Sequence, residues 1–321
     1  MEIFNLTLKQ MLMMFSLILV GFVLRKKSAL PKNSGVVMAK METFILLPAL
    51  YFFTQMKSTV ETFTENAPLI LYGLVIVLCA IILSYPLSRL FVRKETDSAE
   101  NSYQRNIYKY ALAFGNYGFM GNFIVLGVWG EDFFYKYSLF VFMVGILCSS
   151  WGLYILIPKD KNAKLLDNLK KGLLTPPVIA LVVGMLFGLL NLSQYVPQFI
   201  TDALDSAGVC QGPVAMILAG FVIGGYNFKE LLLNKKVYVV TALRLVVIPA
   251  ILMLVLKLIG TNDEIMTLAL IAFATPLGLN TIVYPAAYGG DTKTGASMAM
   301  ISHTLSVITI PLMYLIFIVI L

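Results

Sequence analysis

Long apolar segments separated by short polar loops make up most of the chain. A helix needs about 20 apolar residues to cross a bilayer. Continuous apolar runs are typical of helices, whereas the strands of an outer-membrane barrel alternate apolar and polar positions. The pattern therefore predicts an all-α polytopic membrane protein with ten transmembrane helices. The predicted spans are residues 8–24, 35–55, 68–92, 108–129, 133–157, 172–191, 204–225, 237–259, 265–287 and 295–320.

Basic residues lie almost entirely in alternate loops. The loops 56–67, 130–132, 192–203 and 260–264 carry Lys57 alone. Cytoplasmic loops of membrane proteins are enriched in lysine and arginine. The bias therefore predicts that the other loops face the cytoplasm and that both termini are extracytoplasmic. The basic positions are Arg25, Lys26, Lys27, Lys32, Arg93, Lys94, Arg105, Lys159, Lys161, Lys164, Lys170, Lys171, Lys229, Lys235, Lys236 and Lys293.

The loop 158–171 divides the predicted spans into two sets of five. Because five is odd, the second set enters the membrane from the opposite side, which is the inverted topology of many transporters. We therefore expect a first five-helix repeat over residues 1–157, a cytoplasmic linker over 158–171 and an inverted second repeat over 172–321.

Two of the predicted spans contain residues that disfavour a continuous helix. Residues 113–123 include three glycines and two asparagines, and the matching segment 272–282 includes a proline. Glycine costs a helix about 1 kcal/mol relative to alanine, and proline removes a donor and clashes with the preceding turn. Interrupted segments in matching places of two halves are a strong indication of a transporter's binding site. The residues expected to break the helices are Gly115, Gly118, Gly121 and Pro276.

These interruptions predict a site for an anion. The N-terminal end of a half-helix carries partial positive charge and free N–H groups, which suit a carboxylate. Asn116 and Asn280 would add amide donors. The alternative is a pair of kinked packing helices whose asparagines bond backbone carbonyls. The expected solute-binding residues are Asn116, Tyr117, Gly121, Asn122, Thr275, Pro276, Asn280 and Thr281.

Few ionisable residues lie within the predicted spans, and three are candidates for coupling solute movement to an ion: Glu42, Arg244 and His303. For Glu42 and Arg244, toward the cytoplasmic side, snorkelling or an ion pair is the ordinary explanation. His303 is the only histidine, and a lone histidine is more often a hydrogen-bonded core residue than a proton relay. Tyr51, near a span end, is interpreted as part of an interfacial aromatic belt.

The composition excludes several classes of protein. The 321 residues are 59% hydrophobic and 13% charged, with a mean hydropathy of +0.85, whereas soluble domains are about 25% charged. The net charge of +7 follows the loop pattern, so it indicates orientation and not nucleic-acid binding. The three cysteines lie in apolar runs and are interpreted as packing residues. No phosphate-binding loop motif occurs, and we expect no enzyme activity, no cofactor and no metal.

Several motifs, in order along essentially the whole chain, resemble those of the auxin efflux carrier family. At Phe123 the chain departs from the family, which usually has a proline there, and Asn122 stands where an apolar residue is usual. The matching pieces are GFVLR at 21–25, Leu30-Pro31, FILLPALYF at 44–52, NYGFMG at 116–121, Gly130-Glu131, PPVIA at 176–180, Arg244 with Pro249, Thr275-Pro276, Asn280, and YGGD at 288–291.

The resemblance implies a ten-helix inverted-repeat fold in which helices four and nine cross, similar to bile-acid transporters and sodium–proton antiporters. Helices one, two, six and seven would form a scaffold, often dimeric, and helices three to five and eight to ten a mobile domain that shifts as an elevator. Substrates in the family are organic anions. We therefore expect a homodimer in a bacterial-type plasma membrane that carries a small carboxylate such as malate, malonate or an auxin-like acid.

Three alternatives stay open from the residues alone. The first is a carrier of another solute class coupled to Na⁺ or H⁺, although the mid-membrane aspartate pair of an antiporter is absent. The second is an intramembrane hydrolase, which one histidine and no mid-span carboxylate pair disfavour. The third is a sensor that binds a ligand without moving it, which solute flux in liposomes would distinguish from a carrier.

Overall fold

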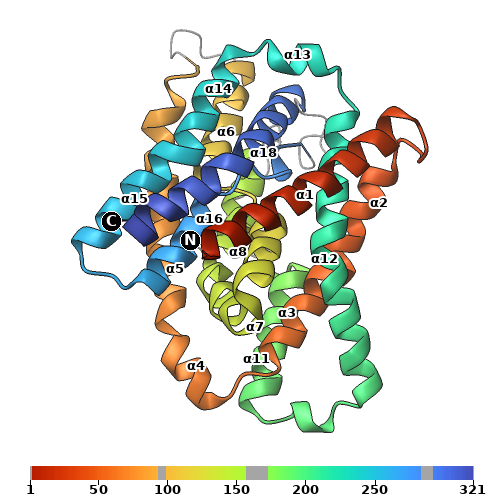
Figure 1. The fold of residues 1–321 in the computed structure, drawn as a ribbon, viewed down its shortest axis with the longest axis vertical. Coiled ribbons are helices and arrows are strands. Elements are labelled where there is room, and N and C mark those ends of the chain that lie inside the picture. Colours follow the sequence, from red (N-terminus) through yellow and green to blue (C-terminus); the bar gives the residue numbers. More distant parts are fainter. Residues whose placement is uncertain (1, 93–98, 157–172, 283–291, 321) are drawn as a thin grey trace.

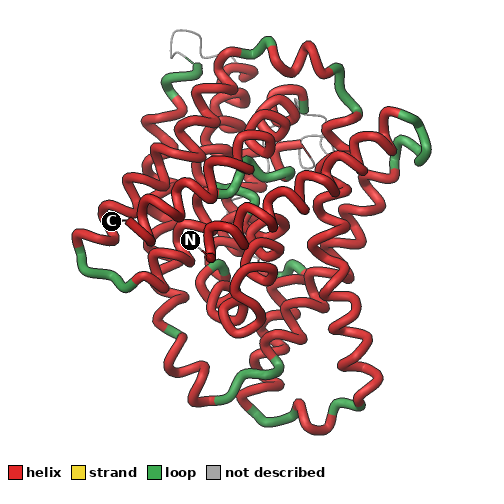
Figure 2. Tube along the Cα trace, viewed as in Figure 1, coloured by secondary structure: helices red, strands yellow, loops and turns green. Residues whose placement is uncertain are grey.

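The structure is a computed structural model that describes residues 2–92, 99–156, 173–282 and 292–320 of the chain. Within these ranges every element is a helix, and loops connect them (Figure 2). One isolated antiparallel bridge joins Gly115 and Leu277. An all-helical polytopic fold is therefore confirmed for the part of the chain that is described.

The first half contains two long uninterrupted helices and a series of shorter ones (Figure 1). In order they are α1 (Glu2–Lys26), α2 (Ser34–Met41), η1 (Glu42–Leu46), α3 (Leu47–Gln55), α4 (Val60–Asn66), α5 (Pro68–Ser88), α6 (Ala99–Ala113), η2 (Tyr117–Gly121), α7 (Asn122–Phe140), α8 (Phe142–Leu147), η3 (Cys148–Gly152) and α9 (Leu153–Leu156).

The second half follows the linker predicted at 158–171, which lies outside the described residues. Its helices are α11 (Pro176–Leu189), η4 (Ser193–Tyr195), α12 (Gln198–Gly224), α13 (Phe228–Leu232), α14 (Lys235–Ala242), η5 (Leu243–Val247), α15 (Ile248–Leu258), α16 (Asp263–Ala274), α18 (Lys293–Tyr314) and η6 (Leu315–Ile320).

Six helical segments of the described chain are long and apolar enough to cross a membrane, or seven if a pair bent by 49° counts as one span. The bent pair is Tyr117–Phe140 with Phe142–Leu156. The predicted fourth and ninth spans are interrupted helices, and the predicted sixth appears as α11, with 14 residues. The helical order follows the predicted order, but the count of ten and the inverted repeat stay predictions. The six segments are Ile3–Lys26, Ser34–Gln55, Val60–Ser88, Gln198–Gly224, Lys235–Leu258 and Lys293–Ile320.

Helices α1 and α12 cross in close contact (Figure 1). A Cβ atom at Gly21 would overlap the Ile217 carbonyl of α12, and one at Gly220 would overlap the Ile18 carbonyl of α1. Small residues let membrane helices approach until their backbones touch, and the tight van der Waals contact stabilises the pair without a hydrophobic driving force. This contact packs the first predicted span tightly against the seventh.

Five π-helical turns lie in the described chain: η1, η2, η3, η5 and η6. Such turns make up well under 1% of residues in globular proteins and occur frequently at functional sites. The first four turns each contain one residue of interest: Glu42, Tyr117, Cys148 and Arg244. The wider helical turns therefore coincide with most of the polar groups described below.

Candidate solute-binding site

The two segments predicted to interrupt their helices meet and pair with each other, and this contact is called the crossing below. Helix α6 ends at Ala113 and α16 ends at Ala274, and the backbone at Thr275 is extended, with φ −66° and ψ 150°. The Asn116 N–H donates to the Pro276 carbonyl over 2.7 Å, next to the bridge between Gly115 and Leu277. The predicted breaks are therefore present, and backbone hydrogen bonds between them satisfy part of the exposed polar backbone.

Helix α18 supports both breaks through two successive residues. Ser302 Oγ accepts the Leu277 N–H over 3.0 Å, and His303 Nε2 contacts Asn116 Nδ2 at 3.2 Å. Both side chains are buried. The crossing is thus held from a third helix, about 190 residues along the chain from the first break.

Arg244, in η5, lies directly behind the first break. Its side chain is fully buried, and Nη1 donates to the Leu112 carbonyl at the end of α6 over 3.2 Å. Nε and Nη2 have no hydrogen-bond partner within the described chain, and the ion pairs found there do not include Arg244. Within the described part of the chain, Arg244 therefore neither snorkels to the surface nor forms an ion pair. An unpaired buried cation gives this region a positive electrostatic potential.

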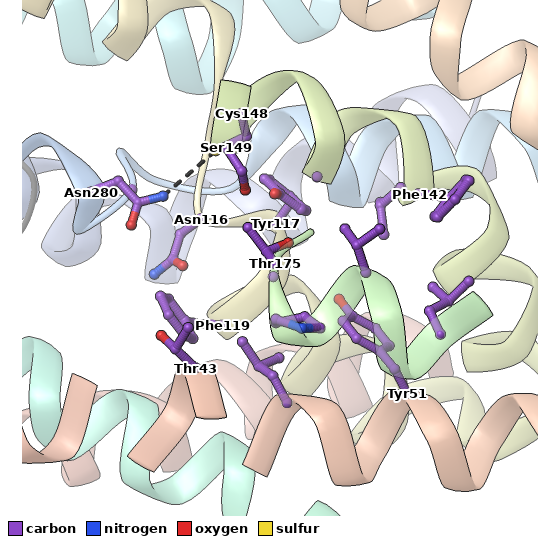
Figure 3. A pocket seen from close by; sticks show the side chains of 18 of the residues that line it. Thr43, Tyr51, Asn116, Tyr117, Phe119, Phe142, Cys148, Ser149, Thr175 and Asn280 are labelled. Carbon is purple, nitrogen blue, oxygen red and sulfur yellow. Dashed lines mark hydrogen bonds between the residues drawn. The ribbon is translucent and has the colours of Figure 1, made fainter. Parts of the chain in front are cut away.

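A cavity of about 150 Å³ opens beside the crossing (Figure 3). Asn116 and Asn280 lie on the same side of it, while Tyr51 and Phe142 lie toward the other. The described residues of its wall carry no formal charge. They are Thr43, Leu47, Tyr51, Gly115, Asn116, Tyr117, Gly118, Phe119, Ser138, Val141, Phe142, Gly145, Cys148, Ser149, Thr175, Pro177, Val178, Leu181, Gly278, Leu279 and Asn280.

The amide of Asn116 is oriented by a neutral His303. Nδ1 of His303 lies 2.7 Å from the Ala299 carbonyl, and because a carbonyl only accepts, Nδ1 carries the ring proton. Nε2 is then an acceptor, and Asn116 Nδ2 donates to it. Asn116 keeps its carbonyl oxygen and one N–H for a solute.

We expect His303→Ala to weaken solute binding roughly fivefold, the effect of losing about 1 kcal/mol of hydrogen bonding, because the Asn116 amide loses the partner that orients it. Thr304→Ala is the matched control, since Thr304 is the next residue of the helix, is exposed and bonds the Met300 carbonyl. The dissociation constants come from ligand-dependent melting temperatures of both variants. Equal affinities would remove His303 from the site.

The second asparagine belongs to a cluster with Tyr110 and Cys148. Asn280 Nδ2 donates to the Tyr110 hydroxyl over 2.9 Å and lies 3.5 Å from Cys148 Sγ, the contact drawn in Figure 3. The same hydroxyl lies 2.9 Å from Cys148 Sγ. Cys148 therefore packs in the buried core, as predicted, and also lies on the cavity wall with polar partners.

The structure divides the predicted solute-binding residues into two groups. Asn116, Tyr117 and Asn280 line the cavity. The others support it: Thr275 and Thr281 bond carbonyls of their own segments. The remaining members of this group are Gly121, Asn122 and Pro276, which are absent from the described part of the wall.

Of the predicted helix-breaking residues, Gly115 and Pro276 lie within the extended segments. Gly118 and Gly121 lie instead inside the π-helical turn η2. A Cβ at Gly121 would overlap the Tyr137 hydroxyl, which donates to the Tyr117 carbonyl over 3.0 Å. Gly121 therefore leaves room for a contact between α7 and the start of the half-helix.

Tyr51 was misinterpreted from the sequence as an interfacial residue. It is buried, with 7% of its surface exposed, and its hydroxyl accepts from Asn122 Nδ2 over 3.2 Å. Tyr51 lines the cavity, so Asn122 acts on the site through it. The sequence did contain one indication, because Asn122 is polar where an apolar residue is usual, next to the position of the family's proline. It did not show that Asn122 would contact Tyr51, 71 residues away.

With this geometry established, comparison with known proteins identifies the family. The profile described as "Membrane transport protein" matches residues 6–314. The chain belongs to this family, that of the auxin efflux carriers. It is 22% identical over 311 residues to an uncharacterized transporter, MJ1031, of Methanocaldococcus jannaschii, covering 94% of this chain and 96% of that one.

Membership of the auxin efflux carrier family confirms the resemblance drawn from the motifs. The chain is accordingly a multi-pass membrane protein of a transporter family. The NYGFMG motif at 116–121 and the Thr275-Pro276 motif form the two sides of the crossing. The YGGD motif at 288–291 lies outside the described residues.

Proposed function

We propose that the protein is a secondary transporter that moves small organic anions through the crossing of its interrupted helices. The observation that carries this proposal is the fully buried Arg244, which has no ion-pair partner among the described residues and lies directly behind a cavity whose polar end is formed by Asn116 and Asn280. The amides provide hydrogen bonds and the guanidinium provides the charge that selects an anion.

The electrostatics of the wall support a negatively charged solute. No aspartate or glutamate appears among its described residues. The half-helix η2 begins at Tyr117, on the wall, and helical backbone resumes at Asn280. The first N–H groups of a helix lack intrahelical partners and attract anions. Two helix starts and a buried arginine therefore all favour negative charge at the same place.

The size of the cavity favours a small acid. Its volume of about 150 Å³ is below the roughly 300–1,000 Å³ of sites for drug-sized ligands. Short carboxylates such as malonate or malate fit this volume better than a bulkier auxin-like acid. Tyr51, Phe119 and Phe142 would contact the apolar part of the solute.

An elevator-type movement is the proposed mechanism, in a fold of ten helices with inverted repeats. The cavity wall combines η1, α3 and α11, assigned to the scaffold, with η2, α8 and residues 278–280, assigned to the mobile domain. A site between two such units changes its access when one slides past the other. The proposal places the solute on the mobile unit, at the crossing.

Removal of the buried charge tests the anion assignment. We expect Arg244→Gln to weaken malonate binding about tenfold and Arg244→Lys to retain most of it. Two unit charges 8–16 Å apart interact by about 1–2 kcal/mol at an effective dielectric constant of 20, and 1.4 kcal/mol corresponds to a factor of ten. The measurement is ligand-dependent stabilisation, about 2.7 kcal/mol at a hundredfold excess over Kd.

Malonamide, the uncharged analogue, is the control for this experiment. Its affinity should be similar in wild type and Arg244→Gln, because only the charge term changes. An equal loss for both ligands would assign Arg244 a structural role and overturn the electrostatic argument. Malonate flux into proteoliposomes then separates a carrier from a sensor, since a sensor would bind without accumulation.

A further inference from the structure

Glu42 is a buried carboxyl that the proposed solute site does not use. It lies in η1 with 0% of its surface exposed, and it is the one aspartate or glutamate in the described ranges that is buried. The side-chain partner that it has among the described residues is Gln211 of α12, whose Nε2 lies 3.4 Å from Oε2. Hydrogen bonds to an ionised carboxylate are usually 2.7–2.9 Å long, so this contact is too long to hold a charge by itself.

Two oxygen atoms at this position lack hydrogen bonds. Glu42 Oε1 and Gln211 Oε1 are both buried without a partner in the described chain, and Gln211 is also fully buried. The amide oxygen of Gln211 can only accept hydrogen bonds, and the same holds for Glu42 Oε1 when the carboxyl is ionised. Neither atom can then donate to the other. Each unsatisfied buried polar group costs about 1–3 kcal/mol, and more when it is charged. With Glu42 ionised, the arrangement is therefore unfavourable.

We propose that Glu42 and Gln211 form a proton-binding site. A proton on Glu42 Oε1 turns that oxygen into a donor to Gln211 Oε1, so one proton satisfies both orphan oxygens and removes the buried charge. The proton is taken from water and returned to water when the carboxyl is exposed. Two side-chain oxygens are few ligands for a metal cation, and no group of three His, Cys, Asp or Glu residues in the described chain forms a metal site.

The ionisable side chains on the helices around Glu42 do not neutralise the negative charge that it would carry as a carboxylate. η1 packs against α2, α3, α11 and α12, and α11 has no ionisable residue. Lys40 of α2 is exposed, as are Asp202, Asp205 and Cys210 of α12. Tyr51 of α3 is buried, and its hydroxyl accepts from Asn122. None of these groups forms an ion pair with Glu42, so no positive side chain among the described residues neutralises the carboxylate, and a proton would.

The position of the carboxyl links it to solute movement. The next residue, Thr43, lines the cavity. Next to Gln211, the ring of Phe123 occupies the space where a Cβ at Gly212 would lie, and Phe123 lies in the first turn of α7, after the first break. The proton site therefore lies between the cavity wall and the contact of α12 with α7. In the proposed function this is the surface along which the mobile unit slides.

Infrared difference spectroscopy on the purified full-length protein tests proton binding directly. At neutral pH we expect a carbonyl stretch of a protonated carboxyl, well separated from carboxylate bands, which Glu42→Gln removes. The neutral amide copies the shape of the protonated acid, so the variant should fold. Gln211→Leu, as a second variant, should shift the band because the carboxyl loses its acceptor. Spectra without a band that depends on Glu42 would overturn the proposal.

Sodium is the alternative occupant, and a titration separates it from the proton. Addition of NaCl at fixed pH, against choline chloride, should leave the carboxyl band unchanged. If sodium alone removes the band, the site binds a metal cation and the proposal is wrong.

The consequence for transport rests on the proposed function and has its own readout. Malonate uptake by wild type should respond to an imposed pH gradient, whereas Glu42→Gln should exchange malonate without responding to the gradient. If wild type moves no malonate, the proposed function fails while the spectroscopic result stands. If uptake by both proteins responds equally to pH, the carboxyl binds a proton that transport does not use.

Discussion

Asn116→Ala and Asn280→Ala should each reduce uptake of the carried acid at least about tenfold while leaving expression unchanged. The two amides lie on one side of the cavity, from segments more than 160 residues apart. A hydrogen bond to a charged group contributes roughly 1.5–3 kcal/mol, and 1.4 kcal/mol is a factor of ten. The measurement is initial uptake rate in proteoliposomes, normalised to the amount of reconstituted protein.

Isosteric variants sharpen this test. Asn116→Asp and Asn280→Asp keep the shape of the side chain but replace a donor with negative charge, which repels an anionic solute. Each should transport less than the corresponding alanine variant. Asn66→Ala is the control, because Asn66 is also a buried asparagine but bonds the Thr62 carbonyl of its own helix and is not on the cavity wall. Normal uptake by both alanine variants would remove the asparagines from the solute path.

The interruptions were predictable because they depend on local chemistry. Pro276 lacks the N–H that a continuing helix needs, and Gly115 supplies the small residue at which the first segment becomes extended. The expectation that the two interrupted segments meet came from their matching positions in the two halves of the sequence. The structure bears out the interruption of both helices, whereas the inverted repeat that suggested it stays a prediction.

The partners of the site residues were not predictable, because they come from long-range packing. His303 and Asn116 are 187 positions apart, and Asn280 and Tyr110 are 170 apart. From the sequence alone, a lone histidine, a tyrosine in the middle of a span or a cysteine in an apolar run could belong either to the packed core or to a binding site. Tyr51 shows the same limit: its place near a span end suggested an interfacial residue, but the approach of Asn122 buries it.

The spans were only partly predictable from hydropathy. Hydropathy measures apolar length, so it merges an interrupted helix with the loop that interrupts it. The fourth predicted span is α6 followed by η2 and α7, and α7 itself turns at Gly130, where φ is 81°. That turn lies at the predicted boundary between spans four and five. The sequence therefore predicted the positions of the turns more accurately than the number of spans.

Gly115→Ala should abolish transport and lower the melting temperature, whereas Gly118→Ala should do neither. A Cβ at Gly115 would overlap Arg244 Nη2 and lie 2.5 Å from Thr275 Oγ1 and 2.9 Å from the Thr275 carbonyl oxygen. The backbone of the second break cannot move away without losing the bond from the Asn116 N–H to the Pro276 carbonyl. Overpacking of this kind costs about 1–3 kcal/mol.

Gly118, three residues later and on the same cavity wall, is the matched comparison. A Cβ there has no atom within 4 Å, and alanine favours helix over glycine by about 1 kcal/mol. Circular dichroism and melting of the two variants in the same detergent measure the structural cost, and uptake measures function. The pair separates a requirement for glycine at the crossing from a general effect of adding a methyl group. Equal melting temperatures and equal uptake would mean that the two breaks do not touch as the structure shows, and the anion site built on their contact would fall with them.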